Sequence, residues 1–235
     1  MASIIDSFRE TFTDHLAFLK IFVFSIPVYF SYQGYLQSNG DLTKISNLLY
    51  VTLFLLFGFL IQTTNNVINE RDMVLSTLNP LKVALSALKG IIAIGPCVAV
   101  SCFAANYLCS LIKVNPGFDV ILDILIWFVA ASVITTCFLM FTTRENILDS
   151  YNLKILFQKG GDLIVSLIVF IIQIVVINIP TTVFISYALL ILFGFGNIFN
   201  VFVSLAFVFN VGVIGHYFGQ LHYENISYNK LDKKE

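Results

Sequence analysis

Charge is scarce in this sequence. Only 11% of its 235 residues are Asp, Glu, Lys or Arg, whereas 58% are hydrophobic, and the mean hydropathy is +0.89. Soluble proteins carry about 25% charged residues. The shortage excludes an ordinary soluble globule and predicts an all-α membrane protein, in which each helix satisfies its own backbone groups. The net charge of −1 gives no indication of a nucleic-acid partner.

Cysteine pairs and enzyme motifs are also missing. The chain has no GxSxG, HExxH, glycine-rich phosphate loop or paired-carboxylate motif. The nearest acidic segment, Asn66–Asp72, offers one acidic repeat where membrane prenyltransferases use two to hold magnesium. We therefore expect no catalytic residue, no metal and no cofactor. Four cysteines lie in apolar runs without CxxC spacing, and we expect them to be small buried hydrophobes: Cys97, Cys102, Cys109 and Cys137.

Long apolar runs are what the sequence has instead. A helix needs about 20 apolar residues to cross the hydrocarbon core. We expect six transmembrane helices, at approximately 20–36, 48–68, 91–112, 120–141, 163–187 and 198–218. The fifth belongs to an apolar stretch that reaches Phe193 and contains Pro180. We interpret it as one tilted, kinked span, because a split at Pro180 would leave two short halves and carry the basic tail across the membrane.

An amphipathic segment precedes each pair of spans, and a polar tail ends the chain. The segments are 3–19, 70–89 and 144–160, and the tail is 225–235. In the first segment apolar residues recur at steps of three or four, the pattern of a helix lying on the membrane surface: Ile5, Phe8, Phe12, Leu16 and Leu19. The first apolar run begins near Lys20 without a cleavage pattern after it, so we expect no signal peptide.

The second and third segments share a start and a bend. Asn79 and Pro80 predict the N-cap and first residue of a short helix that ends at Lys89, after which Gly90 permits a bend. The apolar stripe of this helix is Leu81, Leu85 and Leu88. The third segment is predicted to repeat this pattern. Its cap would be Asp149, its apolar stripe Tyr151 and Ile155, and its bend 159–161.

Basic residues predict the orientation. With six spans, eleven Lys and Arg fall on the side of the two termini, and two fall on the other side. Loops rich in Lys and Arg stay in the cytoplasm, so both termini should be cytoplasmic in a multi-pass protein of the cell membrane, plasma or inner. The eleven are Arg9, Lys20, Arg71, Lys82, Lys89, Arg144, Lys154, Lys159, Lys230, Lys233 and Lys234, and the two are Lys44 and Lys113.

An internal repeat is the simplest explanation of the spacing. Lys20, Lys89 and Lys159 are 69 and 70 residues apart, and each follows an amphipathic segment and precedes a membrane hairpin. Pro27 and Pro96 each lie seven residues after their lysine. The spacing predicts three repeated units, each an amphipathic surface helix plus a transmembrane hairpin, around an axis along the membrane normal. The alternative is that any polytopic protein has basic inner loops at a similar period.

Three segments carry a resemblance to a known family: Asn79–Gly90, Arg144–Phe157 and Gly215–Glu224. They resemble the bacterial and archaeal integral-membrane family catalogued as domain of unknown function 4013, whose loops repeat and whose end is a His-x-x-Gly-Gln-x-x-Tyr-like segment. The resemblance covers about Leu48 to Glu224 and implies a membrane protein without an established activity. The chain departs from the family after Pro80, where Leu-Lys-Val replaces acidic and aromatic residues.

Polar residues at the inner ends of the even-numbered spans form the candidate site: Asn65, Asn66, Glu70, Arg71, Arg144, Glu145, His216, Gln220, His222 and Glu224. On the last span His216, Gln220 and Glu224 are one turn apart, so a metal or lipid-headgroup site is one reading. His222 lies on a different face of the helix, and two histidines with one glutamate on a single helix do not complete the set of ligands that a metal needs. The other readings are a helix end that hydrogen-bonds to its neighbours, and interfacial anchors that set topology.

Deeper polar residues are amides, which commonly join helices by hydrogen bonds in lipid: Asn106, Gln173, Asn178, Asn197, Asn200 and Asn210. No charged residue lies at a clear mid-bilayer position, which argues against a proton pump or voltage sensor. We expect a transport-type component, a small-solute pore or permease. The alternatives are a membrane scaffold or partner-binding protein, and an intramembrane enzyme using His216 and Glu224. The expected partners are the lipid bilayer, other protein chains and copies of itself.

Overall fold

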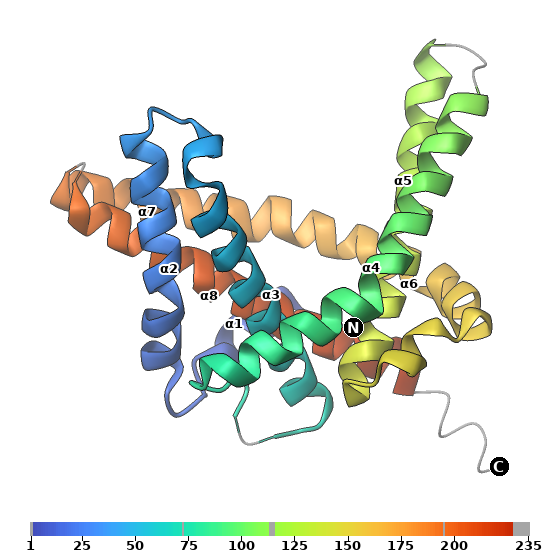
Figure 1. The fold of residues 1–235 in the computed structure, drawn as a ribbon, viewed down its shortest axis with the longest axis horizontal. Coiled ribbons are helices and arrows are strands. Elements are labelled where there is room, and N and C mark those ends of the chain that lie inside the picture. The colour runs from blue at the N-terminus through green and yellow to red at the C-terminus, as the bar shows by residue number, and fades with distance from the viewer. Residues whose placement is uncertain (1, 72, 113–115, 195, 228–235) are drawn as a thin grey trace.

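The computed structural model describes residues 2–71, 73–112, 116–194 and 196–227, and every regular element in them is helical (Figure 1). The α-helices are α1 (Ile4–Thr11), α2 (Ala17–Gln37), α3 (Ser46–Ile68), α4 (Pro80–Leu111), α5 (Pro116–Arg144), α6 (Leu153–Gln173), α7 (Ile179–Phe193) and α8 (Asn197–His222). Two 3-10 turns are η1 (Leu42–Ile45) and η2 (Ile147–Tyr151), and two π-helical turns are η3 (Ile174–Asn178) and η4 (Tyr223–Ser227). Four of the basic residues named above and the end of the polar tail, 228–235, lie outside the described residues; the four are Lys113, Lys230, Lys233 and Lys234.

Five helical segments in the described part are long and apolar enough to cross a bilayer: Leu42–Ile68, Pro80–Leu111, Phe118–Arg144, Leu153–Leu192 and Asn197–Asn225. The all-α class predicted from composition is therefore confirmed, and the five long apolar helices are consistent with the predicted membrane protein. The helix α2, which contains the predicted first span, is not among the five. Its second half carries tyrosine, glutamine and glycine between its apolar residues, which lowers its hydropathy.

The chain forms three helical hairpins, of which α2–α3 and α4–α5 both point upward in Figure 1, whereas α7–α8 lies across the view toward the left. The central helix is α3, which packs against α8, α4 and α2. One buried cluster includes Ile61 of α3 and Tyr217 of α8, and a second joins Phe59 of α3 to Val83 of α4. The outer half of the α4–α5 hairpin stands apart from the other helices in Figure 1.

Small residues let α3 and α4 approach closely. A Cβ atom on Gly58 would overlap the backbone carbonyl oxygen of Val83, and one on Gly90 would overlap the side chain of Ile61. Ser86 and Ala87 continue the buried face of α4. In lipid the hydrophobic effect does not draw helices together, so close backbone approach through small residues is a main source of packing energy.

The first amphipathic segment is shorter than predicted. Its helix, α1, ends at Thr11, and α2 begins at Ala17 after a turn, so 3–19 is not one helix. The side of α1 that packs against α8 buries Ile4, Ser7 and Thr11. In the predicted apolar stripe Phe8 packs inward against Phe209, and the ring of Phe12 also stacks on Phe209. The members other than Phe8 are exposed: Ile5, Phe12, Leu16 and Leu19.

In the second segment the predicted cap is confirmed and the predicted helix end is wrong. The Asn79 side chain accepts hydrogen bonds from the backbone N–H groups of Leu81 and Lys82, and Pro80 is the first helical residue. The helix does not stop at Gly90. It continues as α4 to Leu111, and its direction changes along the way (Figure 1). The predicted stripe is exposed: Leu81, Leu85 and Leu88.

The third segment also departs from prediction. Asp149 does not cap a helix, because Asn146 accepts a hydrogen bond from the N–H of Leu148 and starts the 3-10 turn η2 first. The N-cap of α6 is Asn152, whose side chain accepts from the N–H of Ile155. The predicted bend at 159–161 lies inside α6, where the helix is unbroken.

The fifth apolar run is one long helical segment, Leu153–Leu192, which bears out the interpretation of one segment rather than two. The turn η3 interrupts it just before Pro180. Proline cannot donate to the carbonyl four residues earlier and its ring crowds that carbonyl, and a π-helical turn makes room for both effects. The predicted limits 163–187 are too narrow, since α7 ends at Phe193, followed by Gly194 with φ of +69°.

Candidate functional site

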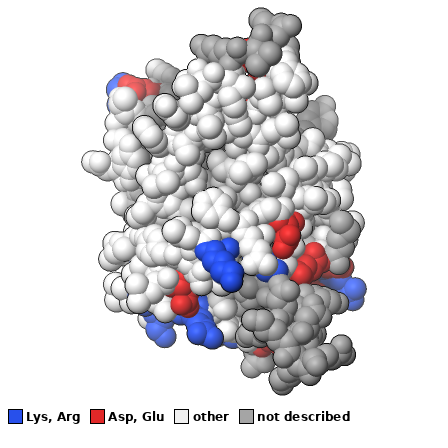
Figure 2. Space-filling view, turned by 90° about the vertical axis from the view of Figure 1, so that its right-hand side faces the viewer, with Lys and Arg blue, Asp and Glu red and all other residues white. Residues whose placement is uncertain are grey.

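Polar and charged residues gather at one end of the molecule, which we call the polar end. It comprises the ends of α3, α5 and α8 together with α1, residues 69–79 and η2. Figure 2 shows most of the charged side chains of the visible face in its lower half, below a largely uncharged surface. All ten candidate residues lie at this end.

Two glutamates end helices here in an unusual backbone conformation. Glu70 follows α3 and Glu145 follows α5, and both have φ of +49°, the left-handed region that glycine or asparagine usually occupies after a helix. Both side chains form hydrogen bonds with other segments. A Glu70 oxygen lies 3.1 Å from the Tyr223 hydroxyl, and a Glu145 oxygen accepts from Ser86 Oγ at 3.2 Å. Arg144, the last residue of α5, is exposed.

The end of α3 holds the loop 69–79 through buried amides. Asn66 donates to the carbonyl oxygen of Leu75 at 2.9 Å and accepts from Arg71 Nη1 at 3.0 Å. Gln62 Oε1 accepts from the Ser76 hydroxyl at 2.7 Å. Asn65 donates instead to the carbonyl oxygen of Thr142 and joins α3 to α5. The predicted asparagines therefore fix the end of α3 to the loop and to α5.

A buried ion pair fixes the start of α2, and sequence reasoning missed it. Lys20 Nζ lies 2.8 Å from Asp14 Oδ2, and both side chains are almost fully buried. The same carboxylate accepts from the N–H of Leu75 at 2.9 Å, and Lys20 Nζ donates to the Leu75 carbonyl oxygen at 3.3 Å. From the sequence, Lys20 contributes only to the predicted orientation and to the predicted repeat. The sequence does contain a signal for the pair, because Asp14 and Lys20 carry opposite charges and lie six residues apart on either side of the start of a helix.

The pKa of Asp14 lies below its ordinary value of 3.8. Burial opposes this shift, but hydrogen bonds from Lys20, Leu16 and Leu75 and the charge of Lys20 outweigh it. The carboxylate is therefore ionised at neutral pH, and the pair is a true ion pair.

The histidines face different helices, as their spacing predicted. His216 lies between α8 and α1, where Nε2 is 2.8 Å from a Glu10 oxygen and Nδ1 is 3.2 Å from Ser7 Oγ. Gln220, one turn later, lies 3.3 Å from His216 Nδ1 and accepts from the N–H of Ser3 at 2.8 Å. His222 faces α5, with Nε2 2.9 Å from Thr143 Oγ1.

The His216 cluster does not form a metal site within the part of the chain that is described, where no three His, Cys, Asp or Glu side chains converge. Glu224 lies in η4, one turn beyond Gln220, and His216 meets Glu10 rather than Glu224. The cluster instead docks α1 onto α8. Glu10 and Ser7 were missed as its partners because they lie more than 200 residues away in sequence.

A polar cavity of about 220 Å³ lies between α3, the loop, the first turns of α4 and the end of α5. Three of the predicted residues line it, namely Asn66, Arg71 and Glu145. Its other lining residues were not among the predicted site residues and come from α3, the loop and α4: Gln62, Thr77, Lys82, Leu85 and Ser86.

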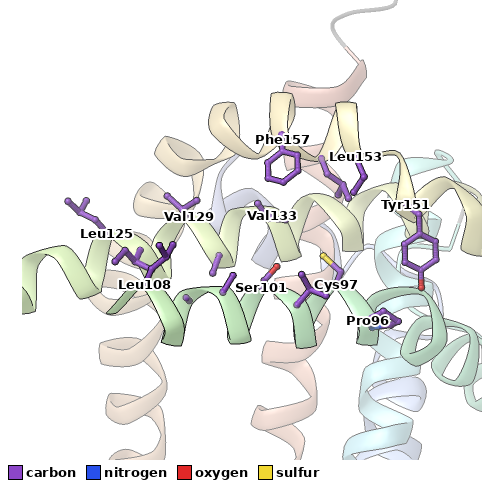
Figure 3. A pocket seen from close by; sticks show the side chains of 16 residues that line it. Pro96, Cys97, Ser101, Leu108, Leu125, Val129, Val133, Tyr151, Leu153 and Phe157 are labelled. Carbon is purple, nitrogen blue, oxygen red and sulfur yellow. The ribbon is translucent and has the colours of Figure 1, made fainter. Parts of the chain in front are cut away.

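A larger cavity of about 660 Å³ lies between α4, α5 and the start of α6 (Figure 3). Its lining is almost entirely apolar, and Figure 3 shows Val129, Leu153 and Phe157 among the side chains around it. The Tyr151 hydroxyl is 2.9 Å from the carbonyl oxygen of Ile92, so its ring closes one end while its polar atom is satisfied.

The deeper amides mostly join segments. Asn178 Nδ2 donates to Asn210 Oδ1 at 2.7 Å, which links η3 to α8. Gln173, predicted to lie deep in a span, instead accepts from the N–H of Ile4 at 3.1 Å, which joins the last residue of α6 to the first residue of α1.

No family model, curated protein or solved structure matches this chain. The resemblance to domain of unknown function 4013 therefore stays a prediction.

Proposed function

We propose that the chain is a cell-membrane protein that crosses the bilayer six times with both termini in the cytoplasm. Five apolar helices support this, and α2 would supply the remaining span. Its 21 residues extend about 31 Å at 1.5 Å per residue, against a core of about 30 Å. Lys82, Lys89 and Lys154 lie toward the polar end and Lys44 lies between α2 and α3, a distribution that supports a cytoplasmic polar end.

Cysteine labelling tests this orientation. In a chain whose native cysteines are replaced by serine, we expect Lys44→Cys to react with a membrane-impermeant maleimide in intact cells, because it lies on an outer turn and is exposed. Lys82→Cys, also exposed, should react only after permeabilisation. Labelling of Lys82→Cys in intact cells would contradict the orientation.

We further propose that the three hairpins are repeated units: α1 with α2–α3, the start of α4 with α4–α5, and η2 and the start of α6 with the hairpin formed by the rest of the α6–α7 segment and α8. The matching left-handed glutamates after α3 and α5 support an equivalence between the first two units. In this proposal the units surround an axis along the membrane normal.

For the role of the protein we infer a non-enzymatic, membrane-organising component that binds a lipid chain. The observation that carries this inference is the 660 Å³ apolar cavity between α4, α5 and α6. Pro96 and Ala104 of α4 and Val129 of α5 are among its lining residues, which offer a hydrocarbon chain contact without unpaired polar groups. An acyl chain is the occupant that a bilayer supplies at every lateral opening, and it matches this lining.

A transport-type protein, a small-solute pore or permease, is the second candidate. The 220 Å³ polar cavity at the polar end favours it, since such a cavity could receive a solute. The amides that would line a solute path through the protein favour it less, because their hydrogen bonds are made within the protein: Asn178 donates to Asn210, and Asn65 donates to the carbonyl oxygen of Thr142. Proteoliposomes that contain the purified protein and move no solute would remove this candidate.

Filling the apolar cavity tests the lipid-chain role. We expect Ala104→Trp to place an indole in the cavity and to lower by one the number of lipids retained per chain in native mass spectrometry. Phe103→Trp is the matched control, because Phe103 is 75% exposed on the same helix and does not line the cavity. Equal lipid retention by both variants would contradict the role.

A further inference from the structure

Hydrogen bonds between the lining side chains of the polar cavity hold these side chains in place. Gln62 Nε2 donates to Ser86 Oγ at 3.1 Å, and Ser86 Oγ in turn donates to a Glu145 oxygen at 3.2 Å. Gln62 Oε1 also lies 3.2 Å from Thr77 Oγ1, which ties the loop to the same wall. Gln62 and Ser86 are buried, so these hydrogen bonds form in a low-dielectric setting and hold the side chains in place.

Two cationic side chains stand at this cavity. Arg71 is held by Asn66 through one guanidinium nitrogen, and its fork has further N–H donors. Lys82 comes from the first turn of α4, where the positive end of the helix dipole adds to its charge. Glu145 is the only carboxylate among the described lining residues. Two positive charges and one negative charge leave the described lining with a net charge of +1.

The surroundings are those of a membrane interface. Leu85 lines the cavity and is half-exposed, and Leu81 and Leu88 continue an exposed apolar stripe along α4. A ligand held here would therefore have an anionic group in the cavity and an apolar surface beside it.

From these observations we propose that the cavity lined by Arg71, Lys82 and Glu145 binds a phosphate group. Arginine matches phosphate oxygens through its planar fork, and lysine adds a point charge. The phosphate can be carried by a phospholipid, whose diester has one negative charge, or be free in the cytoplasm. This site is separate from the apolar cavity, so the two proposals fail independently.

Binding to defined probes tests the site with the full chain. One probe is phosphatidylglycerol, added as a minor component to nanodiscs of phosphate-free galactolipid, and the other is inorganic phosphate. We expect Arg71→Gln and Lys82→Gln each to weaken binding about tenfold, the loss of one charge-assisted contact. Lys89→Gln is the matched control, because it removes the same charge from α4 without lining the cavity. Circular dichroism confirms that each variant is folded, as expected because Arg71 and Lys82 are exposed and Lys89 is partly exposed.

The two probes distinguish the source of the phosphate. Variant-sensitive binding of phosphatidylglycerol alone would assign the site to a lipid, and variant-sensitive binding of inorganic phosphate would assign it to a free anion. The proposal is overturned if the Arg71→Gln and Lys82→Gln variants bind both probes as tightly as Lys89→Gln does, or if neither probe binds the unmodified chain.

Discussion

Replacing Lys20 with methionine should lower the free energy of unfolding by about 3–5 kcal/mol, the range expected when one partner of a buried ion pair is removed. Methionine keeps most of the side-chain volume but leaves Asp14 without its charge partner. The loop carbonyl of Leu75 would also lose the donor at 3.3 Å. Denaturation of the purified protein in mixed micelles, followed by circular dichroism, measures the effect.

Lys44→Met is the matched control. Lys44 pairs with Asp41 at 3.8 Å, but the two side chains are 67% and 41% exposed. Solvent screens such a pair, and we expect no measurable change in stability. If Lys20→Met were as stable as Lys44→Met, the Asp14 pair would not hold the start of α2.

Acid should weaken the wild-type protein through the same residue. The pKa of Asp14 is lowered in the folded state, so the pair contributes fully above the unfolded value of 3.8 and is lost as the pH falls through the lowered value. In Lys20→Met the buried carboxyl lacks its partner, and burial then raises its pKa. The stability difference between the two proteins should therefore shrink on acidification, and a difference that stayed constant with pH would contradict the assignment.

Gly58→Ala is expected to lower the free energy of unfolding by about 1–3 kcal/mol, although alanine is the better helix former. The added methyl group would meet the backbone carbonyl oxygen of Val83, which cannot rotate away as a side chain could. The helices α3 and α4 must then move apart, and the contact of Gly90 with Ile61 loosens with them.

Gly95→Ala, in α4, is expected to change the free energy of unfolding in the opposite direction. A Cβ on Gly95 meets no atom within 4 Å, so only helix propensity changes, and we expect a gain of about 0.5–1 kcal/mol. Thermal denaturation of both variants measures the contrast. A stabilised Gly58→Ala protein would show that α3 and α4 do not pack as described.

Local signals predicted individual features well. The apolar composition predicted a helical membrane protein, and Asn79 with Pro80 predicted the start of α4, because capping depends on neighbouring residues only. Spacing also placed His216 and Gln220 on one face and His222 on another. Helix ends were predicted less well. Asn146 starts a 3-10 turn before Asp149 can cap a helix, and nothing in the periodicity marks that competition.

Partners across the chain could not be predicted. His216 meets Glu10, and Lys20 with Asp14 meets Leu75, through contacts that exist only after α1 and the loop 69–79 have docked. The faces of α1 and α4 that contact the protein were decided in the same way. Small residues such as Ser7 and Ala87 are buried there together with Ile4 and Val83, whereas most members of the two predicted apolar stripes stay exposed.

The sequence by itself determined that the chain is helical, apolar and charged at one end, because composition and residue period are properties of each segment alone. Only the tertiary structure decided which polar groups meet at that end and where cavities open between helices. Those features depend on how closely backbones approach, and a few small residues such as Gly58 control that distance.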